Sequence, residues 1–169
     1  MEHNERTAKE RANMPEGTQV ILNSRTLDNS HKRLAELLQP GMTVLDIGCG
    51  TGAITSGIAQ IVGAQGKVVG IDSNHQLIEE AKQKWSEIAN LSFEVGDIYN
   101  LNYSNEFDIV TSSRVLQWLS SPKMAVKSMI NAVKEGGQIV ILDYNHEKIV
   151  WHPEPPKSMQ KFYGQFLKW

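Results

Sequence analysis

The stretch Thr43–Ile54, TVLDIGCGTGAI, decides the fold that we expect for this chain. An apolar run with one acid inside it is followed at once by three glycines at alternate positions. A tight turn from a strand into a helix needs backbone angles that glycine adopts without strain. The missing side chains also let a ligand approach the backbone, and the free N–H groups of the next helix point towards it. The stretch therefore predicts a ligand-binding strand–turn–helix unit.

The rest of the chain alternates between patterns typical of strands and of helices. Strands are expected at 43–47, 67–71, 91–95, 107–112 and 138–144. Helices are expected from Ser30 to about residue 38, over 53–62, from a Ser73 capping box onward, and from Pro122 to the KEGG sequence at 134–137. Strand–helix alternation with short connections predicts an α/β fold with a doubly wound, mostly parallel sheet.

The composition excludes several classes of protein. With 169 residues, 40% apolar and 21% charged, and a net charge of −2, the chain has the composition of a globular domain, and no nucleic acid is expected as a partner. Cys49 is the only cysteine and the histidines show no ligand-like spacing, so no metal site is expected. The start is polar and no 18-residue apolar run occurs, which predicts a cytoplasmic protein without a membrane span.

Acids close the first three expected strands. Asp46 lies inside the end of the first, Asp72 ends the second, and Asp97 closes the third. Ligands of parallel α/β sheets bind outside the carboxyl ends of the strands, where these acids would meet. The G-x-G-x-x-A spacing of residues 48–53 also fits the relaxed dinucleotide fingerprint, so an NAD(P)-dependent oxidoreductase stays open. Asp46 argues against it, because a carboxylate there repels a pyrophosphate and attracts a cation.

Five segments, in this order, resemble the motifs of class I S-adenosylmethionine-dependent methyltransferases. They are VLDIGCGTG, VVGIDSN, FEVGDIYNL, FDIVTSSRVLQWL and VKEGGQIVILDY, and they span about Thr43 to Tyr144. The resemblance implies a Rossmann-like methyltransferase fold, S-adenosyl-L-methionine as cofactor and S-adenosyl-L-homocysteine as product. The expected reaction is an in-line displacement at the methyl carbon by a small-molecule methyl acceptor.

Carried over by position, the resemblance also implies a set of cofactor-binding residues. They are Asp46 for the amino group; Gly48, Cys49 and Gly50 around the methionine part; Asp72 and Ser73 at the ribose; Asp97 and Ile98 at the adenine; and Ser113 and Arg114 after the fourth strand. Arg25 is a further candidate, for the cofactor's carboxylate, with a solvated surface arginine as the alternative. The catalytic residue is unknown; Arg114, Tyr144 and His146 are candidates near the expected substrate mouth, and plain loop residues are the alternative.

Three parts are expected along the chain. Residues 1–40 form an N-terminal polar segment and helix covering the site, 41–145 the cofactor-binding core, and 146–169 a connector and the start of a helix. The family fold usually ends in an antiparallel hairpin, which we do not find. The apolar strand at 138–144 would then form a sheet edge. We therefore expect a truncated chain or an edge covered by a partner, which leaves a homodimer open. A non-catalytic cofactor-binding module is the alternative to an enzyme.

Overall fold

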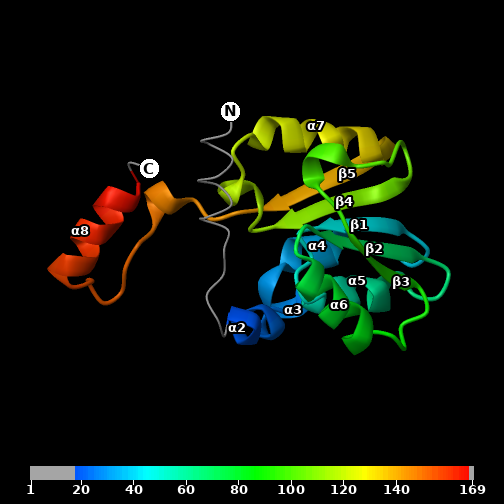
Figure 1. The fold of residues 1–169 in the computed structure, drawn as a ribbon, viewed down its shortest axis with the longest axis horizontal. Helices are drawn as coiled ribbons and strands as arrows, with labels where there is room; N and C mark the ends of the chain where they lie inside the picture. The colour runs from blue at the N-terminus through cyan, green and yellow to red at the C-terminus, as the bar shows by residue number, and fades with distance from the viewer. Residues whose placement is uncertain (1–17, 168–169) are drawn as a thin grey trace.

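A five-stranded parallel sheet forms the centre of the computed structural model, which describes residues 18–167 (Figure 1). The strand order is β3-β2-β1-β4-β5, so the order reverses between β1 and β4. The strands are β1 Thr43–Ile47, β2 Lys67–Asp72, β3 Leu91–Val95, β4 Phe107–Ser113 and β5 Val133–Leu142. The predicted fold class is confirmed. Residues 1–17 of the expected N-terminal segment and residues 168–169 of the C-terminal one lie outside the described residues.

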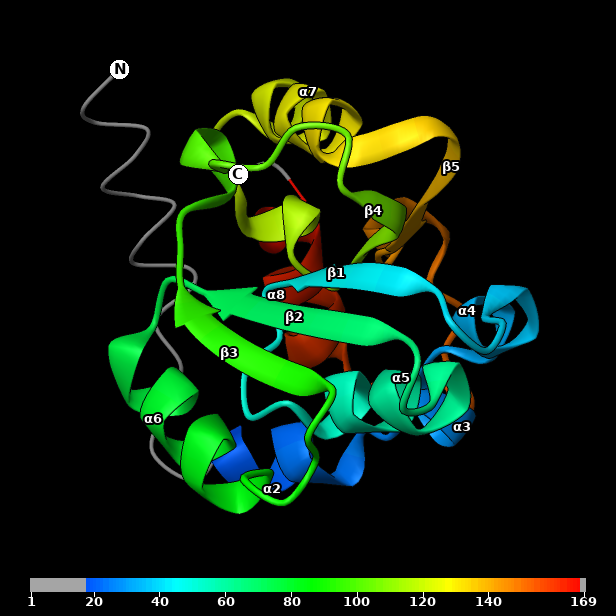
Figure 2. The same ribbon diagram turned by 90° about the vertical axis from the view of Figure 1, so that its right-hand side faces the viewer.

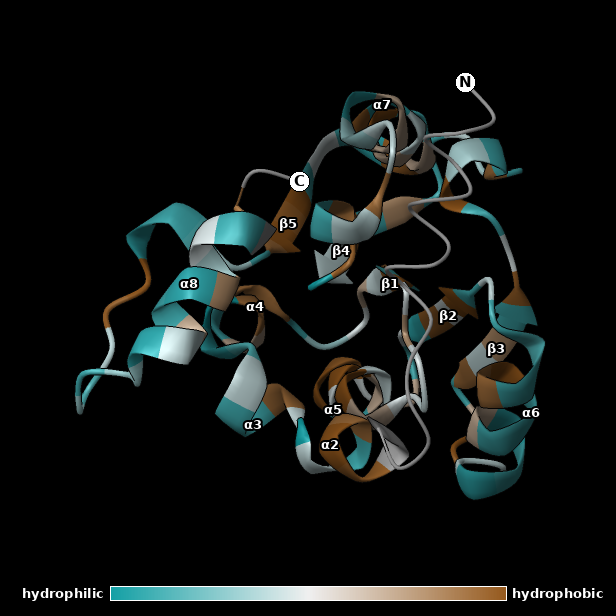
Figure 3. Ribbon diagram, turned by 60° about the vertical axis from the view of Figure 1, so that its left-hand side comes forward, coloured by the Kyte–Doolittle hydropathy of each residue, from teal (hydrophilic) through white to brown (hydrophobic). Residues whose placement is uncertain are grey.

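Helices cover both faces of this sheet. They are α2 Thr18–Ser24, α3 Leu27–Ser30, α4 Lys32–Leu37, α5 Ala53–Val62, α6 His75–Lys84, α7 Pro122–Ala132 and α8 Lys157–Phe166, with 3-10 turns η1 Ile98–Asn100, η2 Leu116–Trp118 and η3 His146–Lys148. Helix α7 packs on one face, and α5 and α6 pack on the other (Figure 2). In Figure 3, α5 is mostly apolar, whereas α6 alternates between apolar and polar residues.

The alternation of side chains along β1 supplies both halves of the core. Leu45 and Ile47 belong to the cluster that α7 completes, and Val44 belongs to the cluster that α3, α4 and α5 complete. Because successive side chains of a strand point to opposite faces, Asp46 lies on the α5 side with Val44. The acid in the apolar strand is therefore directed to the start of α5, where the glycine turn also lies.

Two predicted helix starts need correction. Residues 27–37 form two short helices rather than one helix capped by Ser30: Thr26 caps α3, and His31 is the residue between α3 and α4. At α6 the cap is not Ser73 but Asn74, whose side chain accepts the N–H groups of residues 76 and 77. The reason lies one residue before Ser73, because the Asp72 carboxylate accepts the Asn74 N–H and makes residue 74 the last one before the helix.

The start of β5 also differs from the prediction. Helix α7 ends at Ala132 rather than at the KEGG sequence, and β5 begins at Val133 rather than at residue 138. The KEGG residues form a bulge: Phe107 pairs with Val133 and Ile109 with Gln138, so two steps along β4 face five along β5. Gly136, with φ of +77°, takes the left-handed conformation that such a bulge uses.

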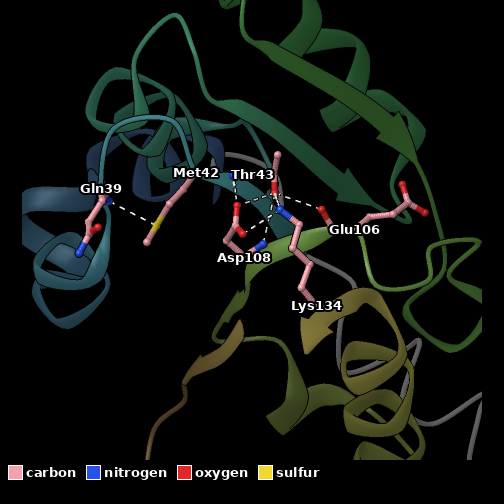
Figure 4. A network of polar contacts seen from close by, with 6 residues as sticks. All are labelled: Gln39, Met42, Thr43, Glu106, Asp108 and Lys134. Atoms are coloured by element: carbon pink, nitrogen blue, oxygen red, sulfur yellow. Dashed lines mark hydrogen bonds and ion pairs between the residues drawn. The ribbon is translucent and has the colours of Figure 1, made fainter. Parts of the chain in front are cut away.

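A polar network fastens the amino ends of β1, β4 and β5 (Figure 4). The Thr43 backbone N–H donates to Asp108 Oδ2 at 2.7 Å, and the Lys134 ammonium, from the bulge, donates to Asp108 Oδ1 at 2.8 Å. Partial burial acts to raise the pKa of Asp108, but the hydrogen bonds from Lys134 and Thr43 outweigh it and lower that pKa. This end of the sheet is thus held by a stabilised carboxylate.

The C-terminal part stands apart from the sheet. Strand β5 is an edge of the five strands described in residues 18–167, and Ile141 on it is 40% exposed. The expected amphipathic helix is present as α8, away from the other helices (Figure 1). It is tied back through the Tyr163 hydroxyl, which donates to the His146 carbonyl at 3.0 Å, and through the Trp151 ring, 5.5 Å from that of Tyr163. Across residues 18–167, no helix is long and apolar enough to cross a membrane.

Candidate functional site

A pocket opens at the carboxyl ends of β1 and β4, beside the point where the strand order reverses. This is the place where open α/β sheets bind their ligands. Seven of the predicted site residues line it: Arg25, Asp46, Gly48, Cys49, Gly50, Ser113 and Arg114. Four further residues complete the lining: Leu22, Thr51, Ala53 and Ile54. The pocket therefore joins α2, the glycine turn, the start of α5 and the end of β4.

The glycine turn owes its shape to close approaches from neighbouring side chains. Gly48 has a φ of +73°, and a Cβ added to it would collide with Val115. Gly52 has a φ of +74°, and its Cβ would lie 2.5 Å from the Phe93 ring. The N–H of Gly50 donates to Asp72 Oδ2 at 2.9 Å, which fixes the turn to the end of β2. A bare backbone is thus held in one conformation at the pocket wall.

Asp46 is a buried carboxyl in the pocket lining, with 3% of its surface exposed. The Thr55 hydroxyl donates to its Oδ2 atom at 2.7 Å. Burial raises the pKa of Asp46 to about 6, the Thr55 hydrogen bond opposes this, and the charge of Asp72 adds to it. A positively charged group placed in the pocket would favour the ionised form. Such a group would thus lower the pKa of Asp46 again.

Asp72 lies next to the pocket rather than in its wall. One of its oxygens accepts the Gly50 N–H and the other accepts the Asn74 N–H, each at 2.9 Å. A carboxylate has about four lone-pair sites, so both oxygens can still accept from ligand hydroxyls. Asp72 therefore orders the turn and remains able to bind.

Three other predicted residues do not line the pocket. Ser73 is exposed after β2, and Asp97 is exposed after β3, where its side chain accepts the Tyr99 N–H at 2.9 Å. Ile98 is buried in the core on the α7 side. They share the carboxyl edge of the sheet with the pocket, because neighbouring parallel strands end on the same edge.

The three catalytic candidates fall into two groups. Arg114 has a φ of +62°, donates from Nε to the Tyr144 hydroxyl at 2.9 Å, and lies 5.3 Å from the centre of that ring. A second hydrogen bond of its side chain runs from Nη2 to the Ser30 carbonyl at 3.4 Å. His146 instead lies with Nδ1 3.1 Å from the Tyr163 hydroxyl. Arg114 and Tyr144 are thus one unit at the pocket, and His146 faces α8.

Cys49 does not have the surroundings of a nucleophile. Burial raises the pKa of its thiol well above the ordinary value, and the charges of Asp46 and Asp72 add to this effect. Reactive cysteines need the opposite, a positive and partly exposed environment.

The sequence analysis missed several polar groups near the pocket. Burial raises the pKa of Asp143, although hydrogen bonds from the backbone N–H groups of residues 115–117 and the charge of Arg114 act to lower it. The Oδ1 atom of Asp143 has no hydrogen-bond partner among the described residues. As the acid at the end of β5, Asp143 carries the same signal as Asp46 and could have been found. Burial, and then Arg114, lower the pKa of His31, whose Nε2 also lacks a described partner. No periodic signal marks His31.

Buried hydroxyls without partners lie along the same edge. The side-chain oxygens of Thr51, Ser112 and Ser113 are buried and have no hydrogen-bond partner among the described residues. Buried polar atoms of this kind usually mark bound water or a ligand. Together with the glycine cradle and the buried Asp46, they fit a polar, partly cationic organic ligand. In the described part of the chain, no group of three or more His, Cys, Asp or Glu side chains could hold a metal ion.

Comparisons with known proteins find methyltransferases by sequence and by structure. A family model described as Methyltransferase domain matches residues 38–165. The chain is 35% identical over 133 residues to demethylmenaquinone methyltransferase of Staphylococcus aureus, covering 77% of this chain and 53% of that one. It is similar in structure to a SAM-dependent methyltransferase from Aquifex aeolicus, with a TM-score of 0.65, 25% identity, and 75% and 69% of the two chains covered.

A further similar structure carries a ligand. PKMT2 from Rickettsia typhi, in complex with AdoHcy, matches with a TM-score of 0.55 and 25% identity over 59% of this chain and 20% of that one. The chain spans about half the length, or less, of the first curated relatives it matches.

Proposed function

The chain belongs to the methyltransferase-domain family, and from this premise we propose that it transfers a methyl group from S-adenosyl-L-methionine to a small-molecule acceptor, leaving S-adenosyl-L-homocysteine. The net charge of −2 supports a small acceptor rather than a nucleic acid. So does the similarity to a relative whose name gives demethylmenaquinone as its substrate. The cytoplasmic location and the homodimer stay predictions.

One observation carries the proposal: a buried carboxyl, Asp46, lies beside a turn in which every second residue is glycine. We assign the cofactor's amino group to Asp46, its methionine part to the backbone of residues 48–50, and its carboxylate to Arg25. Helix α2 and Arg25 reach the pocket from the N-terminal side, which supports the expected covering role of that segment. A pyrophosphate would lie against the Asp46 charge, and this disfavours the oxidoreductase.

Two strand ends beside the pocket would hold the rest of the cofactor. Asp72 would accept from the ribose hydroxyls, flanked by Ser73, and Asp97 with Ile98 would contact the adenine. When bound, the sulfonium supplies the methyl group and a good leaving group. The residues of the chain then position the reactants and exclude water, a contribution that reaches about 7–11 kcal/mol in favourable cases.

A base is needed only for an acceptor that arrives protonated. Tyr144 is the better placed of the loop candidates, because its hydroxyl already accepts from Arg114 and sits next to the pocket lining. His146 is further from this role, since its ring lies against the Tyr163 hydroxyl. We therefore propose the Arg114–Tyr144 unit as the acceptor side of the site.

Titration calorimetry with S-adenosyl-L-homocysteine tests the cofactor assignment. The wild type should bind it, and Asp72→Ala should lose about tenfold or more in affinity, because hydrogen bonds to a charged group contribute about 1.5–3 kcal/mol. Asp28→Ala, an exposed acid on α3 outside the pocket lining, is the control and should bind as the wild type does. No heat with this ligand, together with a fluorescence change on adding NADH, would overturn the proposal in favour of the oxidoreductase.

A further inference from the structure

The last residue of α6 and the one after it contact two segments that border the pocket. Trp85 follows the helix as its C-cap residue, and its indole N–H donates to the Thr51 carbonyl in the glycine turn at 2.9 Å. Its ring also lies under the turn, with Cδ1 3.0 Å from the position that a Cβ on Gly52 would take. The Trp85 side chain, directly after α6, therefore supports the turn.

Lys84, the preceding residue, contacts helix α2. Its ammonium donates to the Asn23 side-chain oxygen at 2.7 Å, across 61 positions of sequence, and lies 4.9 Å from the centre of the Trp85 ring. Asn23 belongs to α2, whose next residue towards the N-terminus, Leu22, lines the pocket. Among the described side chains, this is the one hydrogen bond shown between α2 and an element that follows α3.

Among residues 18–167, few other contacts hold helix α2, so this link matters for its position. Val20 and Ile21 are 74% and 54% exposed, so its apolar residues are only partly packed. Leu22 nevertheless reaches the turn: its Cδ1 atom lies 3.7 Å from the position of a Cβ on Gly50. A hydrogen bond at the end of α2 would keep Leu22 and Arg25 over the pocket.

We propose that Lys84 and Trp85 are positioning residues for the pocket: Trp85 fixes the glycine turn from below, and Lys84 holds α2 across the opening. The inference rests on the proposed function, since it concerns how this pocket retains its ligand. Trp85 acts through the Thr51 carbonyl and Lys84 acts through Asn23, so neither residue needs to touch the ligand. Their loss should show mainly as faster ligand dissociation.

The test compares three single variants with a matched control. Trp85→Phe keeps a ring but removes the N–H, whereas Lys84→Met and Asn23→Ala break the link to α2 from either side. Lys82→Met removes a charge from the same helix, where Lys82 pairs with Glu79 instead. The readouts are the affinity and dissociation rate of S-adenosyl-L-homocysteine, the melting temperature without ligand, and amide hydrogen exchange without ligand.

The proposal expects a split between binding and stability. Trp85→Phe should weaken binding about fivefold, the equivalent of one neutral hydrogen bond. Lys84→Met and Asn23→Ala should each speed dissociation of the ligand about two- to fivefold, which is the effect expected for an exposed polar pair. Their melting temperatures should equal that of Lys82→Met. The Lys84→Met/Asn23→Ala double variant should be no worse than either single one, because both remove the same contact.

Two results would overturn the inference. The first is wild-type affinity for S-adenosyl-L-homocysteine in both Trp85→Phe and Lys84→Met. The second is a loss of affinity in each variant that is proportional to its fall in melting temperature. Amide hydrogen exchange without ligand tests the positioning role independently of the proposed function. Lys84→Met should speed exchange in residues 20–25, and Trp85→Phe should speed it in residues 48–52. If the wild type does not bind S-adenosyl-L-homocysteine, the proposed function is wrong, and unchanged exchange in these segments would reject the positioning role as well.

Discussion

Replacing Asp46 by asparagine should make the variant more stable relative to the wild type as the pH rises, while weakening cofactor binding. Burial raises the pKa of Asp46 from 3.8 to about 6. At about 1.4 kcal/mol per unit, this shift of about 2 units corresponds to about 3 kcal/mol at most. Because the folded pKa is the higher one, the native state gains relative stability where the carboxyl is protonated. That advantage is lost as the pH rises from about 4 to about 6. Above this range the buried, ionised carboxylate destabilises the native state by the full amount.

The pH dependence separates this effect from other consequences of the change. Thr55 can still donate to the asparagine oxygen, and burying the new amide group costs free energy that does not vary with pH. The free energy of unfolding, measured with urea at about pH 4.5 and pH 8, should therefore shift in favour of Asp46→Asn by about 2 kcal/mol between the two conditions. Calorimetry at about pH 8 should show at least about tenfold weaker binding of S-adenosyl-L-homocysteine.

Asp108→Asn is the matched control because its pKa shift has the opposite sign. The hydrogen bonds of Asp108 outweigh partial burial and lower its pKa, so its contribution is present at neutral pH and is lost as the pH falls through the folded pKa. Asp108→Asn should therefore be less stable than the wild type, with a gap that narrows in acid. An Asp46→Asn gap that is equal at both pH values, or unimpaired ligand binding by that variant, would refute the reasoning.

Three further changes test other parts of the structure. Gly52→Ala should lower the free energy of unfolding in urea by about 2–4 kcal/mol, because the residue has a φ of +74° and the new Cβ collides with Phe93. Gly63→Ala, with a φ of +68° and open space around it, should lower it by only about 1 kcal/mol, and equal losses would contradict this reasoning. Lys134→Met should cost about 1 kcal/mol in low salt and less in high salt, since the ion pair is 40% and 34% exposed; a salt-independent cost would argue against the pair. Arg114→Gly should change stability by less than about 1 kcal/mol, as relief of its φ of +62° offsets the lost contacts, while methyl transfer falls about tenfold or more; undiminished transfer would exclude Arg114 from the site.

The elements with regular periodicity could be predicted from the sequence. Helix α5 spans Ala53–Val62 as expected, and the first four strands begin at the expected residues. These segments alternate or repeat strongly, and each is bounded by glycine or by polar residues. Asp46 could be placed in the site for the same reason, because the strand and the turn on either side of it fix its position.

The features that depend on partners distant in sequence could not be predicted. Two glycines after a helical pattern indicate a helix end, and only the pairing of Val133 with Phe107 in β4 shows that these residues form a bulge in β5. Ser73 and Asn74 are both good helix caps, and the choice depends on the Asp72 carboxylate. The contact between Arg114 and Tyr144 needs β4 and β5 to be neighbours, which their order along the chain does not state.

The bulge in β5 lies between the amino end of the strand and its regular pairing with β4. The surplus residues between Val133 and Gln138 lie before the regular pairing, which then runs without a break from Ile109↔Gln138 to Ser113↔Leu142. We expect a shift in the end of α7 to change the bulge and to leave the later strand pairs in register. We therefore expect the alignment of Ser113 with Leu142 to tolerate a change in the number of bulge residues.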